Sequence, residues 1–254
     1  MLGLFVEDIE LLRLAGTPAA IQCVYPSASE QPLSTPRIES ELRALAERAR
    51  REVAGAAERA HVRWSFRTVR GKVPAEVLLA AAEADLLTLG EVGRAIARRL
   101  GLGSTARAAI AGARTSLLLV QGPVSRTQPV LAVYDRSAGA EEVCRFAARL
   151  AESTSGRLTV LLTSPSRRRE PGIEAEVARL VARKKLRVRF RWLATDEKQE
   201  FLRAVQSEEG GVLVISGQSP YLEEKIVEKI LRQTAHPLLI LGARADTVLL
   251  TRPE

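Results

Sequence analysis

Short apolar runs alternate with amphipathic stretches along the second half of this chain. The runs are rich in Val, Leu and Ile, have the length of strands, and lie at 130–135, 157–162, 187–193, 212–215 and 237–241. Between them, apolar residues recur at helical spacing and predict helices over 140–152, 174–184, 197–208 and 221–233. Strands that alternate with helices predict a doubly wound α/β fold, in which a parallel sheet carries helices on both faces.

The first half repeats the later part of this order. The segment 61–66 mirrors 187–192, the segment 85–90 mirrors 212–217, and the segment 116–120 mirrors 237–241. We therefore interpret the chain as an internal duplication that joins near residues 122–128, with one domain over 1–124 and a second over 125–254. Within the first copy, 26–36 predicts an exposed loop and 37–60 predicts a long helix before the strand at 61–66.

The first copy lacks its first strand. Leu2–Val6 corresponds to Leu158–Leu162, so no segment corresponds to the strand at 130–135 and the helix after it. The first strand of such a sheet lies in the middle, and its absence leaves unpaired backbone groups on both sides of a gap. We expect that the chain as given is truncated or that another segment fills this place.

A glycine-spaced segment in the first copy predicts a phosphate site. Gly90, Gly93, Gly103, Ser104 and Thr105 lie between an apolar run and a predicted helix. Glycines let backbone N–H groups approach phosphate oxygens, and the free N–H groups at a helix start favour an anion. The alternative is structural, with a glycine C-cap and a tight turn after the strand. The second copy is six residues shorter at this place, which predicts no phosphate site there.

Composition restricts the functional classes. The chain has 254 residues, of which 46% are hydrophobic, and no apolar run approaches the roughly 20 residues that a membrane helix needs. The start of the chain has no signal-peptide pattern. Cys23 and Cys144 fit no metal or CxxC spacing, which predicts reduced thiols in a cytoplasmic protein. We find no Ser–His or Cys–His set, paired carboxylates or Walker lysine, so we assign no catalytic residue.

The net charge of +8 raises a nucleic-acid hypothesis. Much of the excess lies at 167–169 and 184–191. Because the arginines are dispersed along the chain and no nucleic-acid motif accompanies them, we favour a solvated basic surface. An electrostatic binder of polyanions stays open as an alternative.

The spacing of Gly90, Gly93, Gly103 and Ser104 is G-x2-G-x9-G-[S/T]. This spacing resembles that of the nucleotide-binding members of the universal stress protein family, and the repeated α/β unit resembles the family's tandem form. Gly3–Asp8 also resembles the end of the family's second strand. The resemblance covers nearly all of both halves.

This resemblance implies a sheet order of 3-2-1-4-5 in each copy. It also implies a homodimer, or an intrachain pseudo-dimer, that pairs through the fifth strands. The implied ligand is ATP or AMP, with or without Mg. Gly90, Gly93, Gly103, Ser104 and Thr105 would contact the ribose and the phosphates.

The second copy carries a candidate nucleoside contact. Asp135, followed by Ser137, stands where the resemblance places the acid that ends strand one. Because this copy has no glycine loop, we favour a structural role in which Asp135 caps the helix that begins near Ala138. His61 and His236 lie at the start of predicted strands without metal or catalytic partners nearby, so we expect structural roles for both.

Together these patterns predict nucleotide binding and regulation rather than turnover. The first copy is expected to hold the adenine nucleotide, and the second is a degenerate copy that serves structure or dimerisation. One alternative is a nucleotide-independent interaction scaffold, in which substitution of Gly103 changes stability alone. The other is the nucleic-acid binder, whose affinity would fall steeply with salt.

Overall fold

The computed structural model describes residues 1–18, 20–24, 29–90, 102–112, 114–122, 127–163, 170, 172–183, 185–193, 198–234 and 236–242. The chain divides into two compact units, Met1–Ala80 and Ala81–Glu254. The predicted join of the two copies, between residues 124 and 125, lies outside the described residues. None of the described helices is long and apolar enough to cross a membrane.

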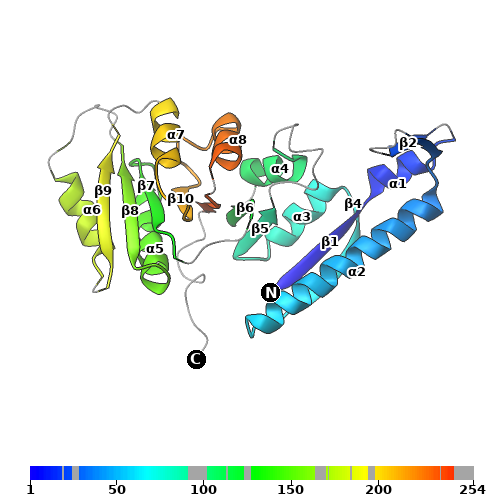
Figure 1. The fold of residues 1–254 in the computed structure, drawn as a ribbon, viewed down its shortest axis with the longest axis horizontal. Coiled ribbons are helices and arrows are strands. Elements are labelled where there is room, and N and C mark those ends of the chain that lie inside the picture. The colour runs from blue at the N-terminus through cyan, green and yellow to red at the C-terminus, as the bar shows by residue number, and fades with distance from the viewer. Residues whose placement is uncertain are drawn as a thin grey trace. The chain divides into compact units, whose positions relative to one another are not determined.

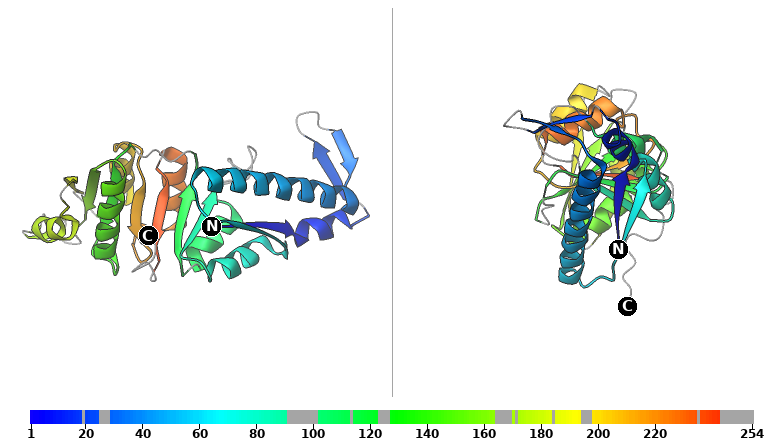
Figure 2. Two further views of the ribbon diagram at one scale, coloured as in Figure 1. Left: turned by 90° about the horizontal axis from the view of Figure 1, so that it is seen from below. Right: turned by 90° about the vertical axis from the view of Figure 1, so that its right-hand side faces the viewer.

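The first unit is built on two parallel strands and a long helix. β1 (Leu2–Asp8) pairs in parallel with β4 (Ser65–Gly71). α2 (Thr35–Arg59) packs along these strands, and Figure 2 shows it as one uninterrupted helix. Apolar side chains of α2 meet those of α1 (Ile9–Ala15) in a small core. The remaining elements are β2 (Ile21–Val24), β3 (Ser29–Pro32) and α3 (Val73–Ala81), which ends at the unit boundary.

The second unit is a seven-stranded sheet with helices packed on it (Figure 1). Its strands are β5 (Leu86–Gly90), β6 (Ser116–Val120), β7 (Val130–Tyr134), β8 (Arg157–Leu162), β9 (Arg187–Trp192), β10 (Leu213–Ser216) and β11 (Leu238–Leu241). Its helices are α4 (Ser104–Gly112), α5 (Ala140–Ser153), α6 (Ile173–Val181), α7 (Lys198–Gln206) and α8 (Glu224–Gln233).

The order of strands confirms the predicted α/β topology. Across the sheet it is β5-β6-β11-β10-β7-β8-β9. The five strands of the second copy, β7 to β11, therefore have the order 3-2-1-4-5. β6 and β11 are antiparallel, with Leu118 opposite Leu239, and every other neighbouring pair in this sheet is parallel. This one antiparallel pairing joins the last strands of the two predicted copies.

The core of the second unit lies around β7. All five residues of β7 are buried, as expected for a parallel strand covered on both faces. Val160 of β8 and Phe190 of β9 pack with α5 and α6 on one face. Because successive side chains alternate, Arg191 points to the other face, where its Nη1 atom donates to the carbonyl oxygen of Ala204 in α7 at 3.3 Å.

The strands of the first copy form two separate pairs. β1–β4 corresponds to strands 2–3, and β5–β6 corresponds to strands 4–5. Among the described residues, no strand takes the place that β7 has in the second copy, so β5 has β6 as its one neighbour. The exposure follows: three residues of β5 are half-buried and two are exposed, whereas all four residues of β10 are buried.

The predicted strand at 61–66 is wrong. α2 ends before Ala60, His61 has a φ of 52° in the turn that follows, and the strand that pairs with β1 is Ser65–Gly71. The alternation of Val62 and Trp64 suggested a strand, but parallel pairing with Leu2 begins at Ser65. The predicted loop at 26–36 is also corrected, because it contains β3, which pairs antiparallel with β2.

The length difference between the copies is five residues rather than six. Leu87 lies opposite Leu117, thirty positions later, whereas Leu213 lies opposite Leu238, twenty-five positions later. In this register the counterpart of Gly90 is Ser216. The sequence pattern instead pairs Gly90 with Gly217, because both are glycines that follow apolar runs.

We predict that Gly211→Ala destabilises the protein strongly. A Cβ atom at Gly211 would lie 1.6 Å from the carbonyl oxygen of Pro129, which belongs to the backbone and cannot move aside cheaply. We expect a loss of at least about 2 kcal/mol in the free energy of unfolding, measured with urea. Gly122→Ala is the control, because a Cβ there meets nothing within 4 Å. Equal stability of the two variants would contradict the packing described here.

Candidate functional site

The candidate phosphate site lies where β5 ends and α4 begins. β5 ends at Gly90, and α4 begins at Ser104, with the first helical hydrogen bond from Arg107 N to Gly103 O at 2.9 Å. α4 returns the chain to the start of β6, which is parallel to β5. The first turn of α4 therefore lies at the carboxyl end of β5. Open α/β sheets bind ligands at the carboxyl ends of their strands.

The first turn of α4 presents hydrogen-bond donors to solvent. Gly103 and Ser104 are exposed, and Thr105 is half-buried. Among the described residues, no hydrogen bond satisfies the hydroxyl groups of Ser104 and Thr105 or the first N–H groups of the helix. Unsatisfied N–H groups and the helix dipole together attract anions. Gly93 lies outside the described residues, so the structure describes four of the five predicted site residues.

The fold gives no reason for a glycine at position 90. A Cβ atom there meets nothing within 4 Å, and its φ lies outside the left-handed region that favours glycine. Gly211, by contrast, is required by a close backbone approach. Packing among the described residues therefore does not require a glycine at this position.

Arg107 of α4 links the candidate site to the second copy. Its Nε atom lies 2.8 Å from Oε1 of Glu224, the first residue of α8, and its Nη2 atom donates to Leu102 O at 3.2 Å. Since both groups are about half exposed, this ion pair contributes about 1 kcal/mol or less. These contacts use Nε and Nη2 of Arg107 and leave its Nη1 atom without a partner among the described residues.

In the second copy, the connection between β10 and α8 is hydrogen-bonded to the turn that follows β7. The buried carboxylate of Asp135 accepts hydrogen bonds from the N–H and hydroxyl groups of Ser137 at 3.0 and 2.5 Å. It also accepts one at 2.5 Å from the hydroxyl group of Ser219, in the connection between β10 and α8. At the start of the same connection, the hydroxyl group of Ser216 donates a hydrogen bond to Ala138 O at 2.6 Å. Asp135 thus has three protein donors.

The structure refines the role predicted for Asp135. Its carboxylate caps the turn at Ser137, but α5 begins at Ala140, and its N-cap is Gly139 at a φ of 87°. The contact with Ser219 had no signal in the sequence, because it joins residues 84 positions apart. Next to Ser219, the ring of Tyr221 stacks on Phe201 with centroids 4.1 Å apart, so the connection is packed rather than open.

The other candidate chemistry is structural. The ring of buried His236 has its nitrogens 2.7 and 3.0 Å from the carbonyl oxygens of Gly211 and Val205. Burial raises the pKa of the Cys144 thiol to about 12, so this cysteine is no nucleophile at neutral pH. No group of three His, Cys, Asp or Glu side chains that could hold a metal ion occurs within the described part of the chain.

Comparison with known proteins finds a family model that matches part of the chain. The model of the universal stress protein family matches residues 7–121, the segment that carries β5, α4 and all five predicted site residues. Residues 7–121 therefore form a segment of the universal stress protein family. No curated protein sequence matches the chain.

Solved structures extend the likeness of fold to almost the whole chain. A universal stress protein from Archaeoglobus fulgidus is 14% identical, with a TM-score of 0.65 over 94% of this chain and 96% of that one. A putative universal stress protein from Pseudomonas aeruginosa is 14% identical, with a TM-score of 0.53 over 95% and 92% of the chains. A protein of unknown function from the same species is 14% identical, with a TM-score of 0.52 over 77% of each chain.

β5 should be less protected from hydrogen exchange than β10, its counterpart in the second copy. β5 is hydrogen-bonded along one edge and is partly exposed, whereas β10 is buried between two neighbours. We predict that amide hydrogens of β5 exchange at least tenfold faster than those of β10, because local opening costs less at an edge strand (a tenfold ratio is about 1.4 kcal/mol). Hydrogen exchange with mass spectrometry measures both strands. Equal protection would show that β5 is covered along its second edge.

The contact that closes the second copy should also be measurable. Ser219→Ala removes one donor from the buried carboxylate of Asp135, and we predict a loss of about 1–3 kcal/mol in the free energy of unfolding. Ser153→Ala is the control, since it removes a hydroxyl whose hydrogen bond lies at an exposed helix end. If the two variants are equally stable, Ser219 does not hold Asp135 in solution.

Proposed function

We propose that the first copy binds an adenine nucleotide, ATP or AMP, with its phosphates at the first turn of α4. The observation that carries this proposal is the open start of α4, where Ser104 is exposed and the first N–H groups have no partner among the described residues. The family segment at 7–121 and the spacing of Gly90, Gly93 and Gly103 support it. Mg²⁺ would accompany ATP as the phosphate-bound cation.

The same proposal assigns binding to one copy of two. The second copy has a shorter connection, and its acid is held by Ser137 and Ser219. We propose that this copy serves structure, with the antiparallel pairing of β6 and β11 acting as an intrachain pseudo-dimer contact. The protein would then act in the cytoplasm as a nucleotide-dependent regulatory protein rather than as an enzyme.

Titration calorimetry with MgATP tests the proposal, after bound nucleotide has been removed and identified. We predict binding by the unmodified chain and a loss of affinity of at least roughly tenfold, or about 1.4 kcal/mol, in Gly90→Val. A branched side chain at the end of β5 would cover the backbone that phosphates approach. Because the space around Gly90 is open, the variant should keep its midpoint of thermal unfolding.

Thr88→Val is the matched control for this experiment. It places the same side chain at an exposed position of the same strand, two residues before Gly90, and should bind MgATP like the unmodified chain. Absence of binding by the unmodified chain, or equal affinity of Gly90→Val, would contradict the proposal. Either result would favour the scaffold function.

A further inference from the structure

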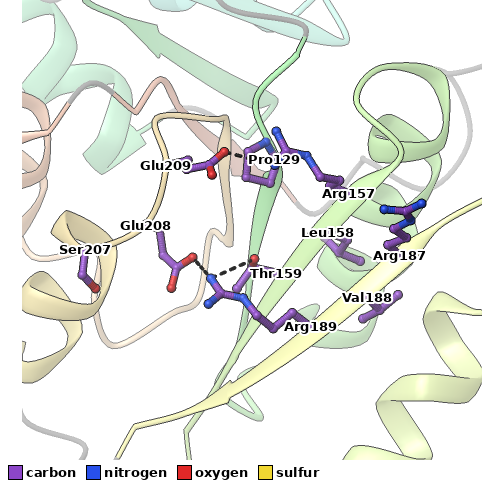
Figure 3. Close-up of a pocket in the computed structure, with 10 residues that line it drawn as sticks. All are labelled: Pro129, Arg157, Leu158, Thr159, Arg187, Val188, Arg189, Ser207, Glu208 and Glu209. Carbon is purple, nitrogen blue, oxygen red and sulfur yellow. Dashed lines mark hydrogen bonds and ion pairs between the residues drawn. The ribbon is translucent and has the colours of Figure 1, made fainter.

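A cavity lies at the ends of the strands opposite to those that form the candidate nucleotide site. It has a volume of about 360 Å³ and forms at the beginning of β7, β8 and β9, whereas the nucleotide site lies at strand ends. Figure 3 shows its lining, which includes Arg157, Arg187 and Arg189 on one side and Glu208 and Glu209 on the other. A cavity of this size accommodates a small ligand.

Arginines gather here because of strand register. Arg157, the first residue of β8, lies directly opposite Arg187, the first residue of β9, and Thr159 lies opposite Arg189. Since side chains alternate, all four face the same side of the sheet. Like charges at directly opposite positions repel each other and destabilise a sheet. An anion between the two arginines would turn this repulsion into attraction.

The carboxylates of the cavity neutralise part of this charge. Glu208, whose side chain is 2% exposed, accepts hydrogen bonds from both Arg189 and Arg191. Glu209 lies 3.2 Å from Nη1 of Arg157. The three arginines that line the cavity (Arg157, Arg187 and Arg189) face two carboxylates, which leaves one positive charge in excess, and Arg191 adds a second beside the cavity.

Arg187 is the unused cation of the group. Among the described residues, no hydrogen bond or ion pair involves its side chain, which is exposed. Arg189 contacts Glu208 and Thr159 through Nη2, which leaves its other N–H groups available. The buried carboxylate of Glu208 fixes Arg189 beside Arg187. Two neighbouring guanidinium groups suit a tetrahedral oxyanion, which accepts forked hydrogen bonds.

We propose that this cavity binds a small phosphate-bearing anion between Arg157, Arg187 and Arg189. The site is independent of the nucleotide site, because it uses the other ends of the strands and residues outside the matched family segment. A purely structural explanation is that arginines protect β9, which is an edge strand, from pairing with other chains. That explanation predicts no selective anion binding.

Pyrophosphate is the probe for the test, in titration calorimetry of the full chain at low salt. We expect binding that weakens at least fivefold in Arg187→Gln. Arg179→Gln is the control, because Arg179 is an exposed arginine of α6 whose Nε atom donates to Ala175 O, and it lies outside the cavity lining. Both variants lose one positive charge, so the control should bind within twofold of the unmodified chain.

Thermal unfolding adds a readout that does not need a ligand. Without pyrophosphate, Arg187→Gln should unfold at the same or a higher temperature, since it removes a repulsion with Arg157. With pyrophosphate, the unmodified chain should gain more stability than the variant. No binding by the unmodified chain, or an equal loss in both variants, would overturn the proposal, the second by showing nonspecific attraction.

The two sites can be told apart. Because ATP also carries phosphates, the Gly90→Val variant should lose MgATP binding but keep pyrophosphate binding. Arg187→Gln should do the reverse. If Arg187→Gln abolishes MgATP binding while Gly90→Val has no effect, the arginine cavity is the site for ATP and the proposed function of the first copy fails.

Discussion

A parallel strand that is buried on both faces also needs a hydrogen-bonding neighbour on each edge, because water cannot reach its backbone N–H and C=O groups. In this chain β7 meets that requirement between β8 and β10, and all of its residues are buried. β5, the counterpart of β10, has a described neighbour on one edge and is partly exposed. The difference in burial between β5 and β10 follows from whether a strand lies beside them in the position of β7.

The two copies also differ at the carboxyl ends of their strands, where the candidate nucleotide site lies. In the second copy, Asp135 follows β7, and its carboxylate accepts a hydrogen bond from Ser219 in the connection after β10. The first copy has no described element that could close α4 in this way, and its longer connection leads to an exposed helix start. The contact of Ser219 in the second copy thus accompanies β7, and among the described residues the first copy has no strand in that place.

Much of the fold could be predicted from the sequence where strands are buried on both faces of the sheet. β7 and β11 are continuous apolar runs, and the predicted bounds of α5 are correct to one residue. Prediction failed at β4, because this strand is partly exposed and contains Arg67 and Arg70, so it has no clear apolar pattern. It also missed the β2–β3 hairpin and α1, which are short and outside the main core. The contacts of Ser219 and of the arginine cavity depend on register between distant segments, which spacing along one chain does not reveal.

The central claim is that one copy of two receives nucleotide phosphates at the start of α4. Backbone amide chemical shifts recorded during titration with MgATP test this most directly. The account predicts the largest changes at Ser104, Thr105 and Ala106, with the amides of Ser137 and Ser219 unmoved. Changes centred on Ser137 and Ser219, or no change at α4 at saturating MgATP, would contradict it.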